Sequence, residues 1–344
     1  MLFWLKICKR GIDILYHIKT VACAISGIIL FSIFSFSCGI LKYDEEDYPI
    51  EETVNEIWMI DLLTGTESFL ANGQFPGFSP DGEHVLFIDN YRTIYSLNLQ
   101  SRSLIRVSPQ LKHLNSFSVS YQTDMIAFAG ISFSANKYDL FIAHCDGNDF
   151  KNLTSSNFYD EYDPGFTADG SLIVYKEGAS ISAIDLEGKK TILQELNSST
   201  ASLPRLSFSK NKLLYIQHPD KTLKIIDLHD SHRDTVIQIS GEFYDLSPVQ
   251  DYVLYSLGSA YLLNLNTFEK QKLIEYARHA RFSPDGNNIV YFDVWGNLVF
   301  FNILSQETKI IKQARVDVRI PALGISPDND KVVYQKDYEI EVRP

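Results

Sequence analysis

A short turn motif recurs along the whole chain at a nearly constant spacing. The pentapeptide Phe-Ser-Pro-Asp-Gly occurs twice, at Phe78 to Gly82 and at Phe282 to Gly286, and altered copies occur elsewhere. The first residues of the seven copies are Phe78, Phe117, Phe166, Phe208, Leu246, Phe282 and Ile325. A period of roughly 20–50 residues is typical of solenoids, propellers and repeat arrays. The spacing therefore predicts seven structural repeats.

Each repeat reads as four short strands. In the best-preserved copy, Pro284-Asp285-Gly286 has the residues that a tight turn requires. The segments around this turn are short and rich in β-branched and aromatic residues, as strands are. The predicted strands of this repeat are Ala280 to Ser283, Asn288 to Asp293, Leu298 to Ile303 and Thr308 to Lys312. Four antiparallel strands in fewer than forty residues form one propeller blade.

The predicted fold class is all-β, a seven-bladed β-propeller over residues 56–344, because no amphipathic helical pattern follows residue 50. Glu56 to Leu70 reads as the third and fourth strands of a blade whose first strands are missing. Ala322 to Val342 supplies first and second strands, and its last residues from Tyr338 could form a third. The N- and C-terminal strands are therefore expected to close the ring in one shared blade. Both a two-plus-two and a three-plus-one division remain open.

One repeat resembles those of TolB-like propellers. Asp146 to Thr154 contains an aspartate-glycine turn and a leucine-threonine pair, and Asp163-Pro164 then precedes Phe166-Thr-Ala-Asp-Gly170. The resemblance covers nearly all of the sequence from Glu56 onward and implies a propeller fold. The same repeat also builds the propellers of prolyl-oligopeptidase-type enzymes and oligogalacturonate lyases, so the resemblance implies little about activity.

Two features of those relatives have no counterpart in the sequence. TolB carries an α/β domain before its propeller, whereas residues 38–55 here read as a short acidic tether. The Gly-x-Ser-x-Gly motif of a hydrolase nucleophile is also absent from the sequence.

Residues 1–37 resemble an export signal or a membrane anchor helix. Four basic residues precede the uncharged segment Thr20 to Ser37, an order that is typical of secretory signals. Cys38 lies between Ser37 and Gly39, as the lipidated cysteine does in bacterial lipoprotein signals. Val21 to Leu41 is also long enough to span a bilayer uncleaved. Lipidation at Cys38 is the first expectation, an uncleaved anchor the second and soluble secretion the third.

The charge of the chain excludes one class of partner. The formal net charge is −12, and it becomes −15 without residues 1–37, which carry four basic residues and one acidic residue. Such a surface repels nucleic acid and anionic lipid headgroups. The expected location is the bacterial cell envelope, where the protein is exported and tethered on the periplasmic or surface side.

No catalytic set is evident in the sequence. The eight histidines are scattered among different repeats, and the only local cluster is His229 and His232 with neighbouring aspartates. We predict an exposed polar turn there rather than a metal site, and neither a metal nor a cofactor is expected.

The segments that lead into each blade are the predicted binding sites, because in propellers they line one mouth of the central channel. Tyrosine and carboxylate side chains, a mixture common at protein interfaces, gather in three of them. The predicted binding residues are Tyr159, Asp160, Glu161, Tyr162, Asp163, Tyr244, Asp245, Arg278 and Arg281. The alternative is that these tyrosines pack between blades while the aspartates cap turns.

The sequence thus predicts a non-catalytic envelope protein whose TolB-like propeller is a scaffold for another envelope protein. The expected state is a monomer that reaches the membrane through a lipid or its N-terminal helix and does not bind nucleic acid. The alternative prediction is a carbohydrate-binding or oligogalacturonate-lyase-like propeller.

Overall fold

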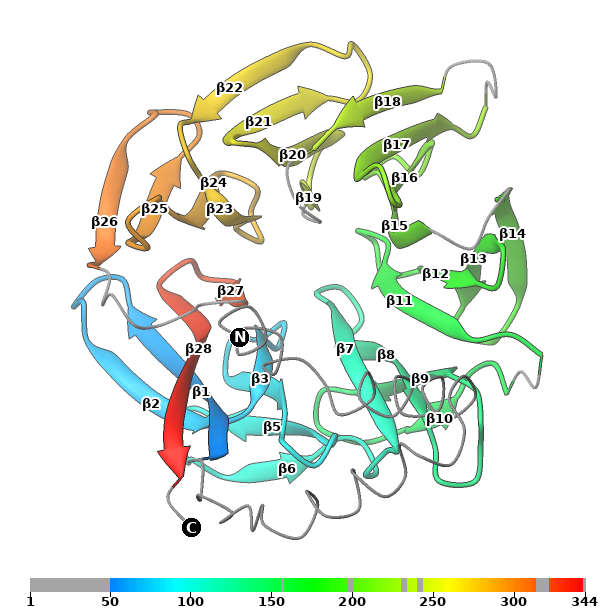
Figure 1. The fold of residues 1–344 in the computed structure, drawn as a ribbon, viewed down its shortest axis with the longest axis horizontal. Coiled ribbons are helices and arrows are strands. Elements are labelled where there is room, and N and C mark those ends of the chain that lie inside the picture. The colour runs from blue at the N-terminus through cyan, green and yellow to red at the C-terminus, as the bar shows by residue number, and fades with distance from the viewer. Residues whose placement is uncertain are drawn as a thin grey trace, which may run out of the picture. The chain divides into compact units, whose positions relative to one another are not determined.

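The computed structural model describes residues 50–155, 158–196, 201–229, 234–239, 244–313 and 322–342. These residues form 28 strands and no helix, and the strands make seven four-stranded antiparallel sheets arranged around a common axis (Figure 1). The protein is therefore an all-β, seven-bladed propeller, as predicted. The predicted N-terminal helix and Cys38 lie outside the described residues.

Six blades are continuous in sequence, and their strands follow chain order from the channel to the rim. Blades 1 to 3 are β3 (Gln74–Phe78), β4 (His84–Ile88), β5 (Ile94–Asn98) and β6 (Leu104–Arg106); β7 (His113–Ser120), β8 (Met125–Ile131), β9 (Asp139–His144) and β10 (Lys151–Asn152); and β11 (Glu161–Phe166), β12 (Leu172–Glu177), β13 (Ser180–Asp185) and β14 (Lys190–Glu195). Blades 4 to 6 are β15 (Ala201–Leu206), β16 (Lys212–Gln217), β17 (Thr222–Asp227) and β18 (Thr235–Gln238); β19 (Tyr244–Leu246), β20 (Tyr252–Leu257), β21 (Ser259–Asn264) and β22 (Lys270–Ile274); and β23 (Arg278–Phe282), β24 (Asn288–Phe292), β25 (Leu298–Asn302) and β26 (Thr308–Lys312).

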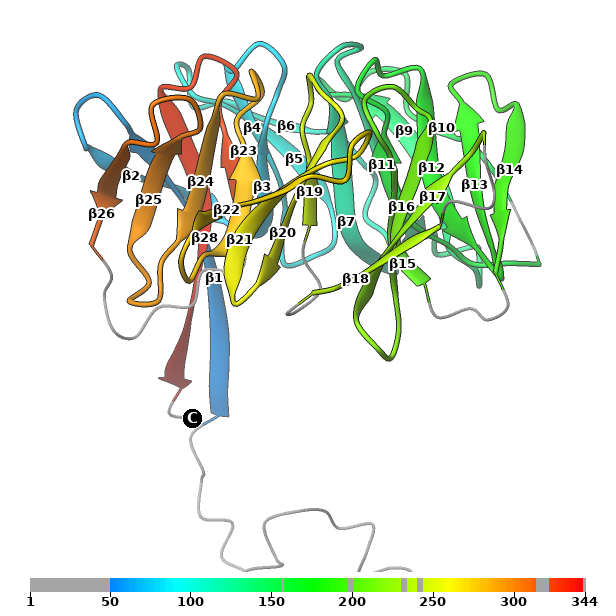
Figure 2. The same ribbon diagram turned by 90° about the horizontal axis from the view of Figure 1, so that it is seen from above.

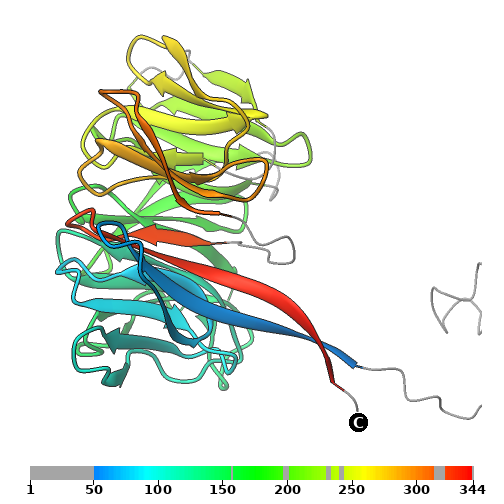
Figure 3. The ribbon, with the colours of Figure 1, turned by 90° about the vertical axis from the view of Figure 1, so that its left-hand side faces the viewer.

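The seventh sheet contains strands from both ends of the described chain. Its order from the channel outward is β27 (Leu323–Ile325), β28 (Lys331–Val342), β1 (Ile50–Asp61) and β2 (Glu67–Asn72), and Figure 3 shows β1 beside β28. Strand β1 begins six residues before residue 56, so the end of the expected tether is strand. Tyr338 to Val342 continue β28 rather than forming a separate strand.

The four strands predicted in the best-preserved repeat are confirmed as β23 to β26, with bounds shifted by at most two residues. The first residue of the turn motif was predicted correctly in five blades but is wrong by two residues in blades 2 and 4. By its pairing with the second strand, Phe78 is equivalent to Val119 and Leu206, not to Phe117 and Phe208. Leu206 is 6% exposed whereas Phe208 is 46% exposed. The prediction had aligned these two blades on an aromatic residue instead of on the aliphatic residue that pairs with the second strand.

A buried hydroxyl follows the first residue of the motif in every blade. The seven residues are Ser79, Ser120, Thr167, Ser207, Ser247, Ser283 and Ser326, and all are at most 4% exposed. In blade 6, Ser283 Oγ accepts a hydrogen bond from Asn288 N at 3.0 Å and donates one to the Asp285 carboxylate. The hydroxyl therefore satisfies the first backbone donor of the second strand, which the turn would otherwise leave buried and unpaired.

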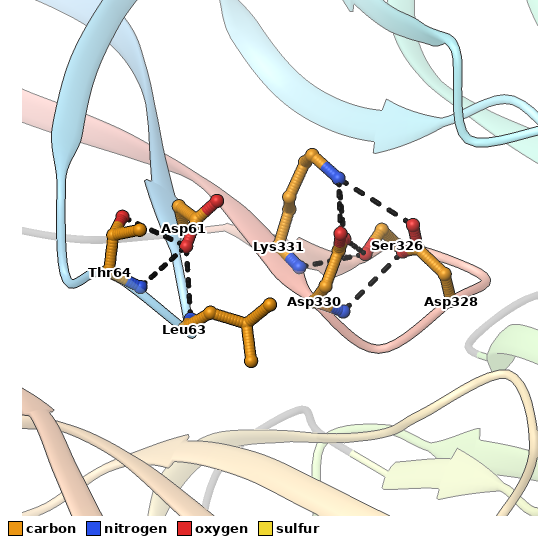
Figure 4. Close-up of polar contacts among 7 residues, drawn as sticks. All are labelled: Asp61, Leu63, Thr64, Ser326, Asp328, Asp330 and Lys331. Carbon is orange, nitrogen blue, oxygen red and sulfur yellow. Dashed lines mark hydrogen bonds and ion pairs between the residues drawn. The ribbon is translucent and has the colours of Figure 1, made fainter.

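The blade 7 turns show the same chemistry together with an ion pair (Figure 4). Ser326 Oγ accepts a hydrogen bond from Lys331 N at 2.9 Å, and Lys331 Nζ lies 2.6 Å from the Asp330 carboxylate. In the neighbouring turn, Asp61 Oδ1 accepts bonds from Leu63 N at 3.0 Å and from Thr64 N at 2.7 Å. Asp61 thus binds backbone amides, as turn residues do.

The hydrophobic core lies between the blades rather than inside any one of them. Seven buried clusters each combine side chains from two neighbouring blades. In one of them, Val174 and Ile181 of blade 3 pack with Leu206 and Leu213 of blade 4. Each four-stranded sheet has apolar side chains on both faces and so requires a neighbour on each side.

The strand ends form two faces, which can be followed in Figure 2. We call the turn face the one that carries the turns between first and second strands and between third and fourth strands. The connector face carries the links between blades and the loops between second and third strands. Within each sheet the strands alternate in direction, so this assignment follows from the strand order alone.

Replacing Ser283 by alanine should lower the free energy of unfolding by roughly 1–3 kcal/mol, because Asn288 N and the Asp285 carboxylate lose a buried partner. Urea denaturation followed by tryptophan fluorescence measures this change. The control is Ser305→Ala in an exposed turn of the same blade, which should change the stability by less than about 0.5 kcal/mol. Equal stability of the two variants would contradict a structural role for the buried hydroxyl.

Candidate functional site

The first strands of the blades surround a central channel that holds two cavities. A cavity of about 340 Å³ lies toward the turn face, and one of about 480 Å³ lies toward the connector face. We call them the turn-side and connector-side cavities. Both are lined by Arg205, Asp245 and Arg281, which come from the first strands of blades 4, 5 and 6. Two predicted binding residues, Asp245 and Arg281, therefore lie together in the channel.

Asp245 joins two blades as well as lining the channel. Its Oδ2 accepts a hydrogen bond from Phe282 N of the next blade at 2.9 Å, and its Oδ1 accepts one from Leu246 N at 3.1 Å. Burial raises the pKa of Asp245, while Arg281, these two amides and Arg205 act in the opposite direction. The carboxylate thus has a structural role that the sequence pattern did not indicate.

A β-bulge interrupts the first strand of five blades and shapes the channel wall. The strand register shifts between residues 74 and 77, 114 and 117, 162 and 165, 202 and 205, and 278 and 281. Phe75, Asp163, Leu203 and His279 occupy the left-handed backbone region within four of these bulges. A bulge changes the direction in which the following side chains point, so it determines how Arg205 and Arg281 meet the channel.

The predicted segment from Tyr159 to Asp163 divides into residues with different environments. Tyr159 is exposed on the connector face, whereas Tyr162 is half-buried with its ring centroid 4.8 Å from that of Tyr138. Asp160 Oδ1 accepts a hydrogen bond from Tyr138 N at 3.0 Å, and its Oδ2 lies 2.9 Å from Lys137 Nζ. Asp163 Oδ2 accepts a bond from Leu203 N at 3.0 Å. Asp160 therefore links two loops of the connector face, and Asp163 links blade 3 to blade 4.

Glu161 is buried between blades 2 and 3 and is only 1% exposed. Its carboxylate accepts hydrogen bonds from the Thr154 hydroxyl and from Leu140 N, the latter at 3.2 Å. Burial raises its pKa to about 7, the Thr154 hydroxyl opposes this rise, and the charges of Asp139 and Glu177 add to it. A partner on the surface could not reach this side chain without a rearrangement of the blades.

The other predicted binding residues give less information. Tyr244 and Arg278 lie in β19 and β23, but their side chains are outside the described residues.

Exposed aromatic side chains gather on the connector face. Among the described residues, every aromatic side chain that is more than half exposed lies on a loop of this face. These residues are Tyr91, Phe133, Phe158, Tyr159, Tyr276 and Trp295, of which Phe158 is 84% and Trp295 76% exposed. Of this set, only Tyr159 was predicted as a binding residue.

The described histidines do not converge on one point. His84 contacts Asn98, His144 lies near Asp149, and His218 contacts Ser202. Within the described ranges, no group of three or more histidine, cysteine, aspartate and glutamate side chains could hold a metal ion. These ranges also contain no apolar helix of membrane-spanning length.

Arg205 was missed because a lone arginine in a strand carries no motif. In the register of the structure, Arg205 lies one residue before the first residue of the turn motif, a position that is often glycine in other blades. The predicted register began this motif at Phe208 and therefore placed Ser207 there. A comparison of this position across all seven repeats singles out Arg205, Asp245 and Arg281.

Comparisons with known proteins bear on the fold. Neither a protein-family model nor a curated protein matches the sequence. An oligogalacturonate lyase from Vibrio parahaemolyticus has a similar structure, with a TM-score of 0.60 and 14% identity over 85% of this chain and 97% of that one. A putative TolB from Agrobacterium tumefaciens has a TM-score of 0.49 and 14% identity over 84% of this chain and 100% of that one. The likeness to the lyase is one of fold.

Glu161 should make the stability of the protein depend on pH. A carboxyl group whose pKa is raised in the folded state keeps its proton there after the unfolded chain has lost it, so stability falls as the pH rises from about 4.5 through 7. In the wild type, the free energy of unfolding should fall by roughly 3 kcal/mol between pH 5 and pH 8, and Glu161→Gln should abolish this fall. Urea denaturation at each pH measures it. The exposed Glu187→Gln is the control and should keep the wild-type pH profile. A wild-type profile in Glu161→Gln would show that the carboxyl titrates normally.

Proposed function

We propose that this protein is a non-catalytic scaffold that binds another protein on its connector face. The observation that carries the proposal is that, among the described residues, every aromatic side chain more than half exposed lies on that face. Tyrosine and tryptophan supply a large contact area with a polar tip, and they are enriched where proteins meet. The loops that hold them rest on a rigid ring of sheets, so they can present a fixed surface.

The cellular setting is part of the same proposal. Residues 1–37 would export the chain to the bacterial cell envelope, and a lipid on Cys38 or an uncleaved N-terminal helix would hold it at the membrane. The net charge of −12 supports a protein partner over nucleic acid. In this proposal the propeller is a monomer, and its partner is another envelope protein.

The proposal predicts that partner binding depends on the connector face and not on the turn face. The test variant is Phe158→Ala with Trp295→Ala, and the matched control is Leu63→Ala with Leu304→Ala, since both leucines are strongly exposed on the turn face. Proteins captured from envelope extract by the full chain are identified by mass spectrometry, and the candidate partner is then purified and titrated. We expect at least a tenfold loss of affinity in the test variant and less than a twofold change in the control, because exposed aromatic anchors contribute most of such an interface.

Three outcomes would contradict the scaffold proposal. A partner that binds both variants equally would place the interface elsewhere. A failure to find any direct protein binder would remove its basis. Retention on polysaccharide, or cleavage of it, would favour the carbohydrate-binding or lyase-like alternative.

We also propose that the N- and C-terminal strands close the ring in a two-plus-two blade. The sheet order and two shared clusters support this: Ile60 of β1 packs with Val332 of β28, and Ile57 packs with Val333. The Glu67 carboxylate on β2 accepts hydrogen bonds from Lys312, Tyr334 and Lys336, which come from β26 and β28. One partly buried acceptor would thus hold strands from both ends of the chain.

Glu67→Gln should weaken this closure. Burial acts to raise the pKa of Glu67, but the bonds from Lys312, Lys336 and Tyr334 outweigh it and lower the pKa to about 2. The ionised form therefore stabilises the fold above pH 4.5, and this stabilisation is lost as the pH falls toward 2. Because 28% of the side chain is exposed and solvent screens its charge, we expect a loss of about 2 kcal/mol at pH 7.

Chemical denaturation at pH 7 and at pH 3 measures this contribution. The difference between Glu67→Gln and the wild type should shrink at the lower pH. Glu307→Gln, in an exposed turn, is the control. A difference that is independent of pH would argue against an ionised Glu67 at the closure.

A further inference from the structure

One position in each blade shows how the channel wall is built. It is the residue before the first residue of the turn motif, and we call these seven residues the waist positions. They are Gly77, Ser118, Gly165, Arg205, Asp245, Arg281 and Gly324. Charged side chains occupy the waist positions of three consecutive blades, and small residues occupy those of the other four. At this level the channel therefore has charged residues on one side and small residues on the other.

Arg205 is held firmly in the charged wall. Its Nη1 donates hydrogen bonds to the backbone oxygens of Asp163 at 3.0 Å and Pro204 at 2.7 Å. The guanidinium lies so close to Gly165 that a Cβ on this residue would be 2.4 Å from Arg205 Cζ. Only glycine at position 165 permits this placement, so the arginine is positioned by backbone groups of the neighbouring blade.

Arg281 and Arg205 share the field of one carboxylate, that of Asp245. Burial lowers the pKa of Arg281, Asp245 raises it, and the positive charge of Arg205 lowers it further. The charge of Asp245 therefore acts on Arg281 more strongly than the opposing charge of Arg205 does. The three side chains together still carry one net positive charge, so an added negative charge near both arginines would be favourable.

The described residues that line the turn-side cavity carry a net positive charge. Three of them are charged, namely Arg205, Asp245 and Arg281, whereas Asp163 lines only the connector-side cavity. Tyr121 also lines it, and the nearby Asp245 charge opposes ionisation of the phenol. Its hydroxyl therefore keeps its proton near neutral pH and can donate a hydrogen bond.

We propose that the turn-side cavity binds a small ligand through a carboxylate or phosphate group held between Arg205 and Arg281. Guanidinium groups bind these oxyanions through paired, charge-assisted hydrogen bonds. A volume of about 340 Å³ suits a small organic molecule, and Phe166, Leu206 and Phe208 provide apolar surface for its body. This site is separate from the connector face, so its test is independent of the proposed scaffold function.

The experiment is calorimetric titration of the purified full chain with inorganic phosphate and with acetate, in a buffer that contains neither anion. We expect one site per chain, and Arg205→Gln with Arg281→Gln should weaken binding at least tenfold. Arg102→Gln removes an exposed arginine from the turn face and should leave the affinity within twofold. Asp245→Asn removes the competing negative charge and should strengthen binding several-fold.

A second variant tests the location without changing any charge. Ala168 lines the turn-side cavity in the turn position that Tyr121 and Phe208 occupy in neighbouring blades, so the fold accommodates an aromatic residue there. Ala168→Phe should narrow the cavity and weaken anion binding at least fivefold while the protein stays folded.

The two anions separate the possible sources of the ligand. Binding of acetate alone would assign a carboxylate, and binding of phosphate alone would assign a phosphate group. Binding that survives in Ala168→Phe or in the double arginine variant would overturn the proposal. So would the absence of binding by either anion to the folded wild type.

Discussion

The structure depends on the burial of apolar side chains between neighbouring sheets. No blade has a core of its own, because its four strands carry apolar residues on both faces and the seven clusters all lie between blades. At about 25 cal/mol per Å² of apolar surface removed from water, an uncovered blade would lose much of its stabilisation. The buried hydroxyls and the inter-blade bond from Phe282 N to Asp245 add direction to this burial, since they fix where each sheet meets the next.

The turn motif was enough to predict the blade number, the strand order in the best-preserved repeat and the register of five turns. It failed at Phe117 because residues two apart in a strand point the same way, so an aromatic residue there resembles the first residue of the motif. It failed at Phe208 because this turn residue is also an aromatic followed by serine. Val119 and Leu206 are identified by their cross-strand partners, Ile126 and Leu213, and such pairing is a property of the folded hairpin. Sequence periodicity alone cannot supply it.

The candidate site was less predictable than the fold. Asp245 and Arg281 were found because charged and aromatic residues stand out before a blade, but Glu161 shared that pattern and is buried instead. The pattern does not indicate whether a carboxylate points outward or toward Thr154 and Leu140 in the preceding blade. The aromatic residues of the connector face were missed for a related reason. Phe133 and Trp295 sit in loops between second and third strands, and only the alternation of strand direction brings them to the same face as Tyr159.

The shared cluster of Ile57 and Val333 has a consequence for how the chain acquires its structure. These two residues lie near opposite ends of the sequence, so their packing must wait until almost the whole polypeptide has been synthesised. Contacts between such distant residues slow folding, because a long loop must close before they form. A late final step is an advantage for any chain that has to be carried unfolded across a membrane before it folds. The order of strands along this polypeptide therefore determines when it can fold as well as what it folds into.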